Sequence, residues 1–107
     1  MGTFAPGDVL LAPVSLDGRA PPKVRPVIVI AAGASGTLHV LPVSSRPSSG
    51  SESLQLNIDN FKTGGLDLFG ESYVITSRVL TITRRQVIGK KGHLNDEAIR
   101  NLLLLSE

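Results

Sequence analysis

Val27-Ile28-Val29-Ile30 is the stretch of sequence that decides the fold. All four residues are β-branched and apolar, at odd and at even positions alike, which is typical of a β-strand. A strand of this kind must be covered on both of its faces. In a small barrel one face fills the interior, and the other face then needs a helix or a second subunit. The stretch therefore predicts a strand of a small β-barrel.

Shorter strand patterns lie on both sides of this segment. Turn and loop residues separate them, among them Asp17-Gly18, Gly33 to Gly36 and Thr63-Gly64-Gly65. Residues 73–82 predict a long strand with a polar break at 76–78, where a bulge is plausible. The other expected strands are residues 9–12, 37–43, 54–58 and 87–88.

The C-terminal residues predict one helix. Asn95 is suited to cap it, and Asp96 and Glu97 place negative charge in its first turn. Leu94 and Ile99 occupy the two positions of a hydrophobic staple. The apolar stripe is wide enough to pack on the barrel alone or to serve a dimer contact as well; it consists of Ala98, Ile99, Leu102, Leu103 and Leu105.

The length of 107 residues predicts a single domain over residues 1–107, and the segment order predicts a mostly-β, SH3-like barrel with a C-terminal α-helix. The chain contains no cysteine, which excludes disulfides, zinc–thiolate sites and cysteine nucleophiles. Only 4% of residues are aromatic and none is tryptophan, which disfavours a peptide-binding SH3 groove. Without a long apolar run or a secretion signal, we expect a cytoplasmic protein that does not contact membranes.

The net charge is only +2, so the placement of the basic residues matters more than their sum. They gather in three groups: Arg19-Lys23-Arg25, Arg78-Arg84-Arg85 and Lys90-Lys91. Paired strands could join the first two groups into a phosphate-binding surface. Ordinary solubilising charge is the alternative interpretation.

Three short motifs follow one another in a characteristic order: Gly7-Asp8-Val9-Leu10, then Arg25-Pro26 before the apolar strand, then Leu41-Pro42-Val43-Ser44. In this order the chain resembles the PemK/MazF toxin family. The family has a glycine–aspartate opening strand, an Arg-Pro pair and a Pro-x-Thr/Ser motif. Residues 71–83 and 92–97 extend the resemblance to nearly the whole chain.

The resemblance implies an SH3-like barrel that dimerises, is neutralised by an acidic antitoxin and cleaves single-stranded RNA without a metal or other cofactor. In the family the 2′-hydroxyl attacks the adjacent phosphate and the 5′-oxygen leaves. Matched residue by residue, Arg25 becomes the catalytic arginine and Ser44 the hydroxyl that stabilises the phosphate. The other residues expected to contact RNA are Lys23, Ser45, Arg46 and Arg78.

Two positions depart from the family pattern. Where many members have a second arginine and an aspartate, this chain has Leu80 and Thr83. Arg78 lies two residues before Leu80, about 7 Å away on the same face of an extended strand, and is a hypothetical substitute. The replacements leave a second function open, in which an inactive barrel binds RNA or a protein.

Several candidate residues also have purely structural interpretations. Arg25 can be a rim arginine paired with Asp8 or Asp17, and Ser44 can simply end a strand. His39 and His93 have no partner at metal-ligand spacing, so we expect no metal site. We expect His39 to be a structural residue of a strand, with its ring nitrogens hydrogen-bonded.

Overall fold

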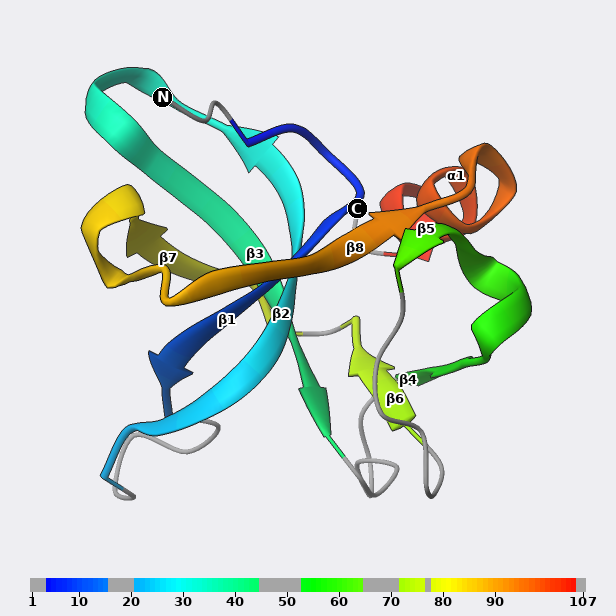
Figure 1. The fold of residues 1–107 in the computed structure, drawn as a ribbon, viewed down its shortest axis with the longest axis horizontal. Helices are drawn as coiled ribbons and strands as arrows, with labels where there is room; N and C mark the ends of the chain where they lie inside the picture. Colours follow the sequence, from blue (N-terminus) through cyan, green and yellow to red (C-terminus); the bar gives the residue numbers. More distant parts are fainter. Residues whose placement is uncertain (1–3, 16–20, 45–52, 65–71, 77, 106–107) are drawn as a thin grey trace.

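The computed structural model describes residues 4–15, 21–44, 53–64, 72–76 and 78–105 (Figure 1). Strands make up most of the regular structure. The elements in chain order are β1 (Asp8–Val14), β2 (Lys23–Ala32), the 3₁₀ turn η1 (Ala34–Gly36), β3 (Thr37–Ser44), β4 (Ser53–Leu56), η2 (Ile58–Asn60), β5 (Phe61–Gly64), β6 (Ser72–Ile75), β7 (Leu80–Thr83), η3 (Arg84–Gln86), β8 (Gly89–Leu94) and the helix α1 (Asp96–Leu105).

The strands form one antiparallel sheet in the order β4-β6-β3-β2-β1-β8-β5, and β7 pairs with β3 off this path. The sheet curls into a half-barrel, with α1 at the end where β8 and β5 meet (Figure 1). This confirms the expected mostly-β barrel fold with a C-terminal helix. β3 has two partners on one side, because its first half pairs with β7 and its last residues pair with β6.

Two apolar clusters cover the two faces of the central strands. The helix-side cluster contains Val9, Ile28, Leu41, Val43, Leu56, Val74, Leu94, Ala98 and Leu102. The inner cluster contains Leu10, Ala12, Val14, Val27, Val29, Leu38, Val40 and Ile82. Val27 and Val29 therefore face one cluster while Ile28 faces the other, so this chain itself covers both faces of the strand.

The start of α1 is fixed as expected from the sequence. The side-chain Oδ1 of Asn95 accepts a hydrogen bond from the Ala98 N–H at 2.8 Å, which is an N-cap contact. Leu94 and Ile99 meet in the helix-side cluster. Leu103 and Leu104 point away from the core, with 38% and 63% of their surfaces exposed.

Several local expectations are wrong. The strand expected over residues 54–58 ends at Leu56, and Ile58 begins the 3₁₀ turn η2. Thr63-Gly64 ends the strand β5 rather than forming a turn, and the last strand is Gly89–Leu94 rather than residues 87–88. β5 and β1 both pair with β8, and this pairing outweighs the poor strand propensity of glycine and lysine. Residues 73–82 form two strands rather than the one long strand expected: β6 ends at Ile75 and β7 begins at Leu80, so the expected polar break separates two strands.

Candidate functional site

Arg25 lies near the start of β2, at the end of the inner cluster. Its backbone is paired with Ala12 of β1. Alternate residues of a strand share a face, so Arg25 lies on the face of Val27 and Val29. Its side chain is half-buried, between the buried apolar residues of β2 and the exposed residues at the start of this strand.

Ser44 is the last residue of β3, the strand that lies beside β2 in the sheet. The β2–β3 register pairs Val27 with Pro42. The pairing of β2 with β3 ends at this pair, and Arg25 lies two residues before Val27 while Ser44 lies two residues after Pro42. Alternation along each strand puts both residues at the same end of the sheet, on the face of the inner cluster.

The Arg25 guanidinium carries an unsatisfied donor. Its Nε is buried and has no hydrogen-bond partner in the described part of the chain. A buried donor left unpaired costs free energy, commonly about 1–3 kcal/mol. Such a group in a native protein calls for an explanation, and an anion that arrives with the substrate would supply the missing acceptor.

Tyr73 is the residue that the sequence analysis missed. It is the residue of β6 paired with Ser44, at the same end of the sheet as Arg25. It is half-buried. The only signal in the sequence was that it is the single tyrosine of the chain. This end of the sheet therefore carries a guanidinium, an alcohol and a phenol.

The other expected RNA contacts have different outcomes. Lys23 is exposed on the face of Arg25, two residues earlier in β2 and paired with Val14. Ser45 and Arg46 lie outside the described residues. Arg78 is exposed, but the expectation that it lies on an extended strand with Leu80 is wrong. Its N–H donates to the Ile75 carbonyl at 3.5 Å, which places it in the turn between β6 and β7.

The two positions that depart from the expected pattern do not lie at the rim of Arg25. Leu80 is paired with Val40 and packs against the inner cluster. Thr83 is paired with Thr37, at the end of β3 opposite Ser44. An arginine at position 80 would therefore put a cation against the core.

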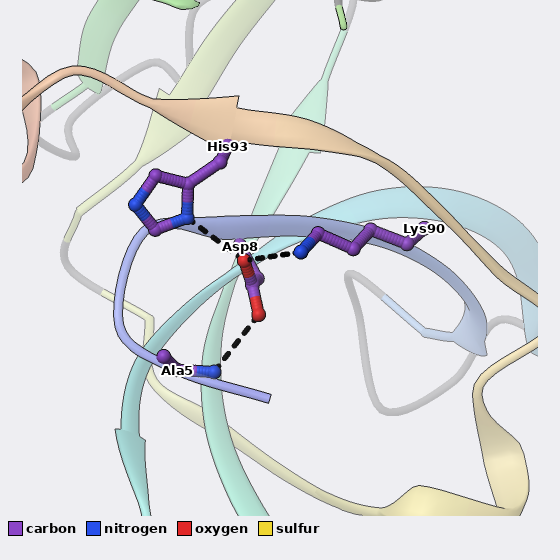
Figure 2. A network of polar contacts seen from close by, with 4 residues as sticks. All are labelled: Ala5, Asp8, Lys90 and His93. Carbon is purple, nitrogen blue, oxygen red and sulfur yellow. Dashed lines mark hydrogen bonds and ion pairs between the residues drawn. The ribbon is translucent and has the colours of Figure 1, made fainter. Parts of the chain in front are cut away.

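Asp8 is tied to the other end of β1 and does not pair with Arg25. Its carboxylate accepts hydrogen bonds from the Ala5 N–H at 2.8 Å and from His93 Nδ1 at 2.8 Å, and Lys90 Nζ lies 3.0 Å away (Figure 2). Burial tends to raise the pKa of this carboxyl, but these three donors outweigh it and hold the pKa below its ordinary value. This rules out Asp8 as the partner of a structural rim arginine; Asp17, the other suggested partner, lies outside the described residues.

The histidines are engaged in structural contacts. His39 Nδ1 lies 3.4 Å from Thr81 Oγ1 across the β3–β7 pair, as expected for a strand histidine. His93 contacts Asp8. No group of three or more metal-ligating acidic or histidine side chains gathers within the described ranges. None of the helices described is long and apolar enough to span a membrane.

Comparison with known proteins shows the family of the chain and supports its fold. Residues 5–104 match the family described as PemK-like, MazF-like toxin of type II toxin-antitoxin system. No curated protein gives a significant match. Among solved structures, the Mycobacterium tuberculosis toxin MazF-mt6 has a TM-score of 0.66 at 16% identity, over 92% of this chain and 90% of that one. An endoribonuclease in complex with its cognate antitoxin, from a mycobacterial species, has a TM-score of 0.54 at 13% identity, over 97% and 94%.

Proposed function

Because the chain belongs to the family of PemK-like and MazF-like toxins of type II toxin–antitoxin systems, we propose that it is a metal-independent endoribonuclease that cleaves single-stranded RNA. The observation that carries the proposal is the buried Nε of Arg25, which has no partner among the described residues and lies at the same end of the sheet as Ser44. A guanidinium in this position is suited to a phosphate, because it stays charged and binds two oxygens at once.

In the proposed reaction the 2′-oxygen forms a bond to the adjacent phosphorus as the bond to the 5′-oxygen breaks. The 2′-hydroxyl gives up a proton and the leaving 5′-oxygen takes one, so the products are a 2′,3′-cyclic phosphate and a 5′-hydroxyl. Arg25 stabilises the negative charge that grows on the non-bridging oxygens, and Ser44 donates a hydrogen bond to the same group. Tyr73 is the proposed proton donor to the leaving oxygen.

Lys23, which precedes Arg25 by two residues on the same face of β2, supplies a further charge for the RNA backbone. Arg78, in the turn after β6, is the proposed contact to a neighbouring phosphate. Ser45 and Arg46 continue the chain directly after Ser44, and we propose that they contact the RNA from there.

The proposed partners are single-stranded RNA, an acidic antitoxin protein and a second copy of this chain. The mycobacterial endoribonuclease in complex with its cognate antitoxin supports the second of these. An RNA substrate of this kind places the activity in the cytoplasm.

The test is incubation of the purified protein with a long single-stranded RNA in EDTA, followed by analysis of the product ends. We expect cyclic phosphate and 5′-hydroxyl ends. A second candidate function, an inactive barrel that binds RNA or a protein, is favoured by Leu80, which packs in the core where the resemblance expects an arginine. RNA that is bound and never cut would establish this second function and overturn the first.

A further inference from the structure

An open cavity lies at the end of the sheet opposite Arg25 and Ser44. Its volume is about 990 Å³, which is ample for one nucleotide. It lies between the β2–β3 connection and η3, roughly 23 Å along β3 from Ser44. The upper left of Figure 1 shows these two segments facing each other. The lining residues are Phe4, Ser35, Gly36, Thr83, Arg84 and Arg85.

The cavity is strongly positive. Among the described residues, its lining includes two arginines and no carboxylate. The acidic residues that the structure describes lie elsewhere: Asp8 in the contact with His93, Asp59 in η2, and Asp96 and Glu97 at the start of α1. Arg85 is exposed and takes part in none of the ion pairs of the described residues. Its guanidinium is therefore available to an anion from outside the chain.

The arginines are held by a fixed turn. The Thr83 N–H donates to the side-chain Oε1 of Gln86 at 2.8 Å, and the Val87 N–H donates to the Arg84 carbonyl at 3.2 Å. These bonds close η3, whose first two residues are Arg84 and Arg85. A fixed turn reduces the entropy lost when the guanidinium groups bind a ligand.

The opposite wall has an unusual backbone. Ser35 has φ of 61° and Gly36 has φ of 78°, and Ser35 is the one non-glycine residue with positive φ in the described part of the chain. Such conformations cost free energy and gather at ligand sites. A Cβ on Gly36 would come within 3.3 Å of Arg84 Cδ, so the missing side chain lets the arginine lie against the hairpin.

The remaining lining residues suit a nucleoside. Phe4 is half-buried against the inner cluster and also lines the cavity, which makes it a stacking surface for a base. Ser35 and Thr83, one in each of the two opposite walls, add residues that carry hydroxyl groups. A phosphate on the arginines and a base on the ring together fit a nucleotide.

We propose that this cavity binds a nucleotide, with its phosphate on Arg84 and Arg85 and its base against Phe4. The nucleotide is either free or one residue of a single strand. This site is separate from Arg25 and Ser44, and its occupancy does not require RNA cleavage.

The experiment titrates the full chain with AMP, adenosine and a single-stranded oligonucleotide with a 5′-phosphate, using calorimetry and backbone NMR. We expect AMP to bind and to shift the amides of Ser35, Gly36 and Arg85, and adenosine to bind at least tenfold more weakly. Tighter binding of the oligonucleotide than of AMP assigns the site to a strand, and the reverse assigns it to a free nucleotide.

Arg85→Ala is expected to weaken AMP binding about tenfold, while Arg100→Ala, an exposed arginine of α1, leaves it unchanged. Phe4→Leu keeps an apolar side chain against the core and should weaken AMP more than inorganic phosphate. The proposal is overturned if AMP causes no shift at this cavity, or if Arg85→Ala and Arg100→Ala bind AMP equally. Repeating the titration with Arg25→Ala separates this outcome from any failure of the cleavage reaction.

Discussion

The Asp8 carboxylate lies 2.8 Å from Nδ1 of His93, a residue 85 positions further along the chain. The contact joins the first residue of β1 to the penultimate residue of β8, beside the start of α1 (Figure 2). Only 4% of the Asp8 side chain is exposed. The conspicuous Gly7-Asp8 pair of the sequence therefore holds the two ends of the fold together and takes no part in the rim of Arg25.

Asp8→Asn should lower the free energy of unfolding at pH 7 by about 1–3 kcal/mol, because the amide gives up the charge that three donors stabilise. Urea denaturation followed by circular dichroism measures this loss. Asp59→Asn, at an exposed position in η2, is the matched control and should change stability little.

The same variant should change the pH dependence of stability. The pKa of Asp8 is lowered in the folded protein, so its contribution is present above the ordinary carboxyl value of about 3.8 and is lost as the pH falls through the lowered pKa. The stability difference between wild type and Asp8→Asn should therefore shrink between pH 5 and the acid limit. A difference that stays constant over this range would contradict the assignment.

The sequence predicts an element correctly where the residues of that element carry a local signal for its structure. Val27–Ile30 and the Asn95 cap carry their own signals, a β-branched run and a capping side chain, and both were predicted correctly. β8 contains two glycines and two lysines, so nothing local marks it as a strand, and its pairing with β1 and β5 forms it.

The candidate site shows the same division. Arg25 and Ser44 were predicted from short motifs, and the two residues lie in neighbouring strands at the same end of the sheet. Tyr73 was missed because its place beside Ser44 depends on a pairing between segments about 30 residues apart, which strand propensity cannot supply. Arg78 was wrongly placed on a strand. The prediction assumed an unbroken alternation of side chains, and the turn after Ile75 interrupts it.

Cleavage should persist in EDTA. The charge needed at the phosphate comes from Arg25 in our proposal, and the described residues offer no cluster of metal ligands. The measurement compares cleavage rates in EDTA and in added magnesium. Activity that disappears with the chelator and returns with magnesium would contradict the proposed mechanism.

Tyr73→Phe should slow cleavage more than it weakens RNA binding, because only the phenol proton is removed. We expect a loss of about tenfold to a hundredfold in the single-turnover rate, with a shift of the alkaline limb of its pH profile. Ser44→Ala should reduce the rate at all pH values alike. If Tyr73→Phe leaves both the rate and the pH profile unchanged, Tyr73 is not the proton donor.

A homodimer is expected in solution, since α1 leaves Leu103 and Leu104 exposed. Sedimentation at micromolar concentration should give twice the 11.3 kDa mass of one chain. Leu104→Lys should shift the protein toward the monomer, whereas Asn101→Lys, which adds the same charge to the same helix, should not. A wild-type protein that sediments only as an 11.3 kDa species counts against the dimer.

Arg25→Ala should slow cleavage by a factor that corresponds to about 2–4 kcal/mol, the usual effect of removing one donor from a developing negative charge. Arg25→Lys should restore little of the rate, because an ammonium cannot bind two phosphate oxygens with one planar group. The fold should be kept, and the unfolding free energy should not fall, since the Nε of Arg25 has no partner to lose among the described residues.

Arg78→Ala, which removes an exposed arginine in the turn after β6, should weaken RNA binding and leave the rate at saturating RNA unchanged. An Arg25→Ala protein that cleaves at the wild-type rate would remove Arg25 from the reaction, and a wild type that binds RNA through Arg25 without cutting it would establish the binding module.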